Sequence, residues 1–142
     1  MEIIEVNKQE YAQEIPSPYF IFGSAPFNNL NRNKCEKVYY LLFRDNKFRL
    51  GIIGGIKNNE FHSPFSAPYG GFSYISRNTS IEHIEEAIKA LLNWAMRKKI
   101  SSINITLPPP IYNSSFITKQ VNSLWRGDFE FKNIDLNHSF NL

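Results

Sequence analysis

Apolar residues recur at helical spacing in one long segment of the chain, residues 79–107. Positions 81, 84, 88, 91 and 95 are Ile, Leu or Ala and lie three or four residues apart, which places them on one face of a helix. Thr79 precedes this stripe and Glu82 lies three residues later, a spacing typical of a capping box. Residues 101–107 then alternate between apolar and polar, which predicts a strand that the prolines after it end. A helix leading into a strand is typical of the middle of an α/β layer.

Two segments rich in β-forming residues come before this helix, at 38–43 and 48–56. Asp45 and Asn46 lie between them, and both residue types tolerate a positive φ. The pattern therefore predicts a β-hairpin with a two-residue turn at these positions.

The remaining N-terminal segments predict shorter elements. Residues 1–6 form either a short edge strand or a free end, and Ser24 followed by Pro26 predicts the start of a short helix. Residues 61–71 contain prolines and glycines, and we expect them to form a loop. Residues 72–75 are expected to form a third strand.

The C-terminal part predicts one more helix and one more strand. Residues 112–126 carry apolar positions at helical spacing, with Gly127 as the stop, and residues 129–136 are expected to form the last strand. The order is then hairpin, strand, helix, strand, helix, strand, which favours an α/β fold with a mixed sheet. A length of 142 residues fits a single domain spanning 1–142.

Composition and charge narrow the classes of partner. The formal charge is +3 with no dense basic block, so we expect no specific nucleic-acid partner. Cys35 is the one cysteine of the chain, which excludes an internal disulfide. Residues 1–5 include acidic side chains and lack the apolar run of a signal peptide. No apolar stretch approaches the length of a membrane helix. We therefore expect a cytoplasmic protein without a membrane span.

Polar residues suited to metal binding or proton transfer do not form a recognisable pattern. The three histidines, His62, His83 and His138, show no metal-ligand spacing, so no metal site is predicted. Glu82, Glu85 and Glu86 suit a general base, but a solvated helix face explains them better, with Glu85 and Lys89 as an i,i+4 pair. No catalytic residue is assigned from the sequence.

Several segments together resemble the GNAT superfamily of N-acetyltransferases. Residues 124–129 resemble its late motif, and residues 63–72, 107–112 and 135–138 resemble the N-terminal domain of the bacterial Fem-like proteins. The resemblance covers residues 20–138. It implies an acyltransferase-like single domain, acyl or aminoacyl transfer as the activity, and a place as the N-terminal half of a larger two-domain protein.

Two departures from the GNAT pattern bear on the cofactor. The coenzyme A loop of that superfamily is rich in glycine and precedes the main helix, whereas residues 76–80 here contain none. Arg77, Asn78 and Thr79 remain as the cofactor-binding candidates that the resemblance implies. The tyrosine of the late motif, often the proton donor, is replaced by Trp125, whose indole cannot act as an acid. Both departures fit a domain that is not catalytic by itself.

Two loops supply the candidate substrate-binding residues. Tyr69, Gly70 and Gly71 belong to a loop where glycines permit close approach of a substrate backbone, and packing of aromatic rings onto the sheet is the alternative. Pro109 and Tyr112 follow the strand at 101–107, where α/β sheets tend to open a ligand crevice. A proline break followed by a packing ring is the alternative for that pair.

Three functions follow as hypotheses. The first is a Fem-like domain that binds a small-molecule or peptide-like acceptor between the Tyr69 loop and Tyr112. The second is a small complete acetyltransferase that binds acetyl-CoA, or another acyl donor, through Arg77 and the start of the helix. The third is a non-catalytic interaction module, such as a homodimer that pairs through the final strand.

Overall fold

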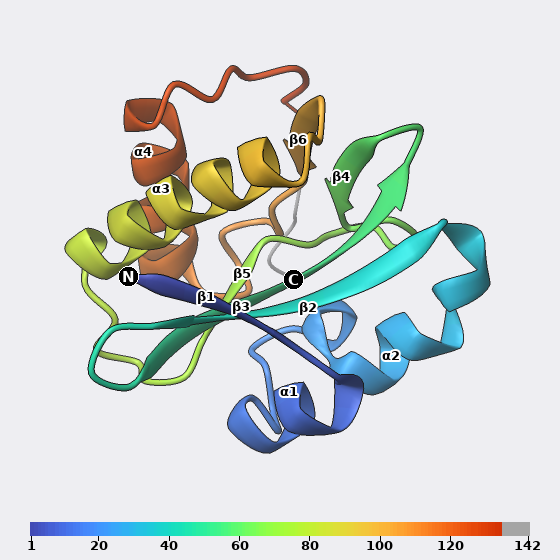
Figure 1. Ribbon diagram of the computed structural model, residues 1–142. Helices are drawn as coiled ribbons and strands as arrows, with labels where there is room; N and C mark the ends of the chain where they lie inside the picture. The colour runs from blue at the N-terminus through green and yellow to red at the C-terminus, as the bar shows by residue number, and fades with distance from the viewer. Residues whose placement is uncertain (135–142) are drawn as a thin grey trace, which may run out of the picture.

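A mixed β-sheet forms the centre of the molecule, and the computed structural model describes it within residues 1–134 (Figure 1). Its strands are β1 (Glu2–Val6), β2 (Lys37–Arg44), β3 (Phe48–Lys57), β4 (Glu60–Ser63), β5 (Phe72–Tyr74) and β6 (Ser102–Ile105). The order across the sheet is β1-β2-β3-β4-β6, and β5 pairs with β3 beyond the end of β4. The β4–β6 pair is parallel and the other pairs are antiparallel. The predicted α/β class with a mixed sheet is confirmed, and of the two alternatives for residues 1–6 the structure has the edge strand.

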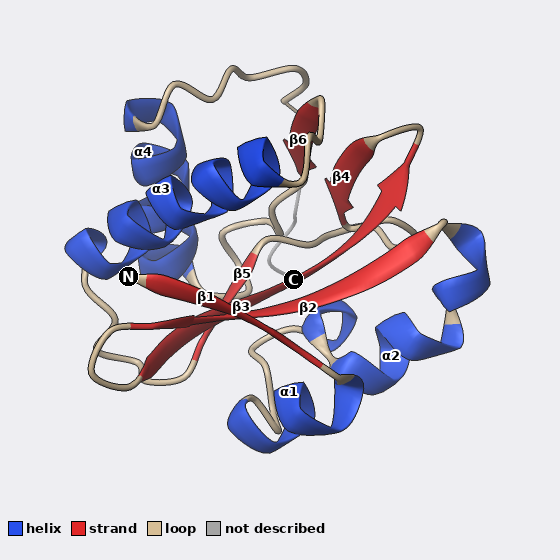
Figure 2. Cartoon of the chain, in the orientation of Figure 1, coloured by secondary structure: helices blue, strands red, loops and turns tan. Residues whose placement is uncertain are grey.

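Helices cover both faces of this sheet (Figure 2). On one side lie α1 (Lys8–Glu14) and α2 (Ala25–Leu30), with the short 3-10 turns η1 (Ile21–Gly23) and η2 (Arg32–Lys34). On the other side lie α3 (Ile81–Arg97) and α4 (Ser114–Arg126). Within residues 1–134, none of these helices has both the length and the apolar character that crossing a bilayer would need.

Residues 38–43, which belong to β2, are almost all apolar because both faces of this strand are buried. Leu41 and Phe43 are buried in the cluster that contains α3, whereas Tyr40 and Leu42 are buried in the cluster that contains α1. Successive side chains of a strand point to opposite faces, so a strand covered on both sides needs apolar residues at every position.

The hairpin is confirmed, but its turn differs from the expectation. Arg44 pairs with Phe48, so three residues form the β2–β3 loop, with a register shift beside it. Asp45 Oδ1 accepts a hydrogen bond from the Lys47 amide at 3.2 Å, which stabilises this longer loop. A two-residue turn with positive φ occurs instead at Asn58 and Asn59, with φ of 50° and 61°, and it joins β3 to β4.

Strand β4 lies inside the segment expected to be a loop. The tight turn before it returns the chain alongside β3, and Phe61 then packs into the core while β4 pairs with β6. The segment 64–71 does connect β4 to β5 without regular structure. The predicted last strand at 129–136 is not found, because residues 129–134 form no strand and the rest lies outside the described residues.

Helix α3 begins one residue later than the capping pattern predicts. The cap is Ser80, whose Oγ accepts a hydrogen bond from the His83 amide at 3.2 Å, while the Ser80 amide donates to His83 Nδ1 at 3.4 Å. Thr79 Oγ1 instead donates to the carbonyl oxygen of Ser76 at 2.6 Å. The predicted cap of α2 by Ser24 and the end of α4 at Gly127 are both confirmed.

Candidate functional site

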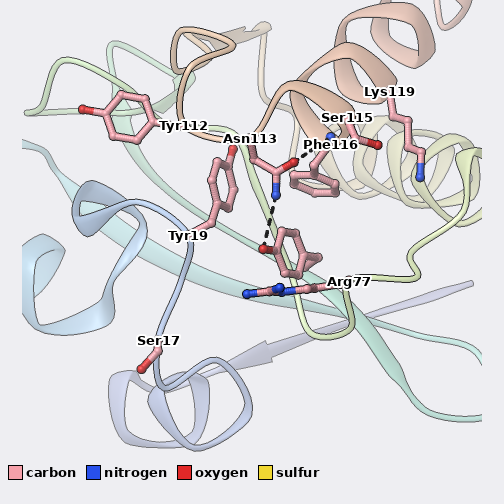
Figure 3. A pocket seen from close by; sticks show the side chains of 9 residues that line it. Ser17, Tyr19, Arg77, Tyr112, Asn113, Ser115, Phe116 and Lys119 are labelled. Atoms are coloured by element: carbon pink, nitrogen blue, oxygen red, sulfur yellow. Dashed lines mark hydrogen bonds between the residues drawn. The ribbon is translucent and has the colours of Figure 1, made fainter.

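A cavity of about 570 Å³ opens between the end of β5 and the start of α4 (Figure 3). Three separate segments of the chain contribute to its walls, and its lining residues are Ser17, Tyr19, Tyr74, Arg77, Tyr112, Asn113, Ser115, Phe116 and Lys119. A volume of this size is in the range that small-molecule ligands occupy. The carboxyl ends of strands are also where α/β proteins commonly place their ligand sites.

Three aromatic rings form one wall of the cavity. Tyr19 and Tyr74 stack with ring centroids 5.6 Å apart and an interplanar angle of 8°. Phe116 lies edge-on to both, at 5.5 Å from Tyr19 and 4.9 Å from Tyr74. Each ring contacts the other two, so the three rings form one packed wall of the cavity.

Asn113 joins the start of α4 to this aromatic wall (Figure 3). Its Oδ1 accepts a hydrogen bond from the Phe116 amide at 3.1 Å, which caps the helix. Its Nδ2 donates to the hydroxyl oxygen of Tyr74 at 3.3 Å. The residue that starts α4 therefore also orients a phenol of the cavity.

Gln120 orients the second phenol of the cavity, Tyr19, as Asn113 orients Tyr74. Its side chain is fully buried in α4, its Oε1 accepts from the Phe72 amide at 2.9 Å, and its Nε2 donates to the Tyr19 hydroxyl at 3.3 Å. Burial raises the pKa of Tyr19 well above its ordinary value, so this phenol keeps its proton.

Two cationic side chains line the same cavity. Arg77 comes from the connection between β5 and α3 and is exposed, and Lys119 comes from the second turn of α4. Lys119 Nζ donates to the carbonyl oxygen of Thr79 at 3.2 Å, which ties α4 to the residues just before α3. The lining includes no Asp or Glu, so the cavity is positively charged.

The structure brings together two candidates that lie far apart in the sequence. Arg77 and Tyr112 both line the cavity. Tyr69 lies next to Tyr112, with ring centroids 5.9 Å apart, and Tyr112 is 46% exposed. The carbonyl oxygen of Pro109 accepts a hydrogen bond from the Tyr112 amide at 3.1 Å, so the proline forms the turn that presents this ring.

The two candidate glycines are buried under the loop. The Gly70 amide donates to the Thr106 carbonyl oxygen at 2.7 Å, and the Gly71 amide donates to Ser63 Oγ at 3.0 Å. Gly71 has a φ of +94°, and a Cβ added there would meet Leu107 Cδ2 at 2.6 Å. Both glycines thus allow the loop to pack closely on the ends of β4 and β6.

The candidates Asn78 and Thr79 are not among the cavity-lining residues. Asn78 is exposed, and its amide donates to Ser76 Oγ at 3.3 Å. Thr79 is buried, and it contributes to the site through its carbonyl oxygen, which holds Lys119. Of the three cofactor candidates, Arg77 therefore has its side chain at the cavity.

Sequence reasoning missed most of the cavity, including Tyr19, Tyr74, Asn113, Lys119 and the supporting Gln120. One signal was available for Asn113, because an Asn directly before a helical pattern is a common cap and places a polar side chain at a helix start. The others are single aromatic or polar residues whose convergence depends on the packing of α4 against β5.

The other residues considered for chemistry have local partners. His62 Nε2 lies 3.7 Å from Glu60 Oε1, and His83 Nε2 lies 3.7 Å from Asp45 Oδ2. Burial raises the pKa of the free thiol of Cys35. Within residues 1–134, no three His, Cys, Asp or Glu side chains group as metal ligands would, and His138 lies outside that range.

The charged residues of α3 stabilise its packing. Glu85 Oε1 lies 2.9 Å from Arg126 Nη1, so this carboxylate contacts α4. Lys98 Nζ, just after the helix, lies 2.8 Å from Glu5 Oε1 on β1. These contacts give both residues structural roles at the ends of α3.

Models of protein families, curated proteins and solved structures were compared with the chain, and none of the three comparisons gave a match.

Proposed function

We propose that this chain is an acyltransferase-type domain, GNAT-like and similar to the N-terminal domain of Fem-like proteins, which binds the acyl acceptor in the Arg77–Tyr112 cavity. One observation carries the proposal: Arg77 and Tyr112, which lie 35 positions apart and are predicted on different grounds, line one cavity. This cavity lies between the end of β5 and the start of α4, and α/β sheets commonly place ligands at the ends of strands.

The chemistry of the lining favours binding over catalysis. Its nine residues include no Asp, Glu, His or Cys, the side chains that most often act as a general base or nucleophile. Trp125, which replaces the tyrosine of the superfamily's late motif, is 61% exposed, stacks on Phe131 at 5.6 Å and is not among the lining residues. The domain would therefore hold the acceptor while another domain supplies the acyl donor.

A complete acetyl-CoA-dependent transferase is the second candidate. The position of Arg77 favours it, because this guanidinium precedes α3 and lines the cavity, and arginine suits a phosphate oxygen well. The glycine-free connection at 76–80 offers less room for the close backbone approach of a pyrophosphate.

A thermal-shift and NMR titration separates these functions. The chain is titrated with acetyl-CoA, with coenzyme A and with lysine-containing tripeptides as amine-bearing acceptors. A ligand present at one hundred times its Kd stabilises the folded state by about 2.7 kcal/mol, which raises Tm by several degrees. Tyr112→Ala is the test variant for the acceptor and Arg77→Ala for the donor, with Trp125→Ala as the matched exposed control.

Each outcome points to one function. Stabilisation by the tripeptides that Tyr112→Ala removes, without stabilisation by acetyl-CoA, supports the acceptor-binding domain. Stabilisation by acetyl-CoA that Arg77→Ala removes supports the complete transferase. No response to any of these ligands contradicts both, and a concentration-dependent dimer in the same samples would then favour the interaction module.

A further inference from the structure

The orientation of the two cavity phenols is fixed by the amide groups behind them. A backbone N–H can only donate, so the Phe116 and Phe72 amides identify Asn113 Oδ1 and Gln120 Oε1 as the side-chain oxygens. The opposite atoms, Asn113 Nδ2 and Gln120 Nε2, are then the amide nitrogens, and these donate to Tyr74 and Tyr19. Each phenol oxygen is therefore an acceptor toward its amide.

Both phenols consequently keep a hydrogen to donate elsewhere. Within residues 1–134, the hydroxyl groups of Tyr19 and Tyr74 accept these hydrogen bonds and donate none. Both line the cavity, and burial keeps Tyr19 protonated. A ligand in the cavity would meet two hydroxyl donors whose oxygens are already occupied.

The two cationic side chains, Arg77 and Lys119, add further hydrogen-bond donors to the cavity. Lys119 Nζ uses one hydrogen for the Thr79 carbonyl oxygen and has two more. Arg77 is exposed at the cavity, and its guanidinium carries five N–H donors. The start of α4 also lies here, and the dipole of its first turn favours negative charge.

Few side chains of this cavity can accept a hydrogen bond from a ligand. No carboxylate lines it, and Asn113 Oδ1 is already used by the helix cap. Ser17 and Ser115 are hydroxyls that can either donate or accept. A cationic group placed here would find few partners, whereas a group that only accepts hydrogen bonds, such as the carboxylate of a tripeptide, would find many.

We propose that the cavity binds the oxyanion of a phosphorylated or carboxylated ligand, with Arg77 and Lys119 supplying the charge and Tyr19 and Tyr74 donating hydrogen bonds. This inference deepens the proposed function and rests on the same cavity, since it names the anionic part of the acceptor. About 570 Å³ exceeds the size of a lone phosphate. The cavity therefore has room for a larger molecule that carries the oxyanion, and the aromatic wall suits an attached ring.

Calorimetric and NMR titrations of the full chain with four small probes test this inference. Phenyl phosphate and benzoate carry a ring with an oxyanion, phenol carries the ring alone, and benzylamine carries the ring with a cation. At constant ionic strength, we expect phenyl phosphate or benzoate to bind and to shift the amide signals at the start of α4. The stronger of the two identifies phosphate or carboxylate as the source of the oxyanion.

Substitutions identify which donors are used. Lys119→Gln and Tyr74→Phe are each expected to weaken the bound probe, by about tenfold for the charged donor and less for the phenol. Lys8→Gln removes an exposed cation from α1, away from the cavity, and should leave the Kd unchanged. Tyr74→Phe keeps the ring in the wall, so it separates loss of the donor from loss of the fold.

Several results would overturn the inference. Binding of phenol or benzylamine as strong as that of the anions would show that the cavity does not select an oxyanion. An unchanged Kd in Lys119→Gln and Tyr74→Phe, with both variants folded by circular dichroism, would place the probe elsewhere. Absence of binding by both anions at 10 millimolar, a level about tenfold above a weak millimolar Kd, would do the same.

Two combinations of results distinguish the oxyanion site from the proposed transferase function. If phenyl phosphate binds through Lys119 while neither acetyl-CoA nor the tripeptides bind, the oxyanion site stands and the transferase proposal fails. If the tripeptides bind through Tyr112 while no anion does, the transferase proposal stands and the oxyanion site fails.

Discussion

Replacing Gln120 by Met tests how the buried amide connects the sheet, α4 and the cavity. The side chain is fully buried and is the partner of both the Phe72 amide, at 2.9 Å, and the Tyr19 hydroxyl, at 3.3 Å. Methionine has a similar length and volume and removes both hydrogen bonds. The change therefore isolates the polar contribution from that of packing.

The expected loss of stability in Gln120→Met comes mainly from the Phe72 amide, which is left without a hydrogen-bond partner. This residue is fully buried, and an unpaired buried N–H costs about 1–3 kcal/mol. The Tyr19 hydroxyl keeps its hydrogen as a donor, so the loss of this longer hydrogen bond adds little. We expect the free energy of unfolding to fall by about 2 kcal/mol, and a chain of this size then loses roughly 6 °C in Tm.

Urea denaturation followed by circular dichroism measures this change. The matched control is Gln13→Met, since Gln13 is exposed on α1 and should change the stability by less than about 0.5 kcal/mol. An unchanged m-value would show that the effect lies in the folded state. A loss below 0.5 kcal/mol in Gln120→Met would refute the assignment of Gln120 as the partner of the buried amide.

Three further predictions concern other parts of the fold. Ser80→Ala removes the cap of α3 and should lower the free energy of unfolding by about 1 kcal/mol in urea titrations; no loss would place the cap elsewhere. Gly54→Ala adds a Cβ against the buried ring of Phe61, and overpacking of this kind costs about 1–3 kcal/mol, which thermal denaturation would detect as a lower Tm. The hydrogen bond from Arg49 holds the pKa of Asp45 at about 2, below its usual 3.8, so this group stabilises the fold above pH 3.8 and loses that effect as the pH falls toward 2. Asp45→Asn should therefore be less stable at neutral pH and show a flatter decline in stability across this interval, and an identical decline in both proteins would contradict the assignment.

Local sequence patterns were sufficient to predict elements whose structure depends on residues within one segment. The apolar stripe at 81–95 predicts α3, Ser24 predicts the cap of α2, and Gly127 marks the end of α4. In each case, the physical cause is periodicity or a backbone group satisfied within a few residues. The hairpin of β2 and β3 follows from the same kind of local information.

Errors arose where two local solutions compete. Thr79 and Ser80 are both good caps, and the helix uses Ser80 because Thr79 bonds back to the Ser76 carbonyl oxygen. Asp45–Asn46 and Asn58–Asn59 both suit a tight turn. The register of β3 against β2 and β4 assigns the two-residue turn to the second pair.

The sequence by itself determined the α/β class, the main helix and two residues of the candidate site, Arg77 and Tyr112. The class and the helix depend on hydrophobic periodicity, Tyr112 on the loop that follows the predicted strand at 101–107, and Arg77 on the resemblance to the GNAT superfamily. Only the tertiary structure decided that Tyr19, Tyr74 and Lys119 share a cavity with them, because segments 17–19, 74–77 and 112–119 meet through packing of α4 against the sheet. The hydrogen bonds of Asn113 and Gln120 that turn the phenols into donors connect residues 39 and 101 positions apart, a distance over which no local pattern in the chain carries information.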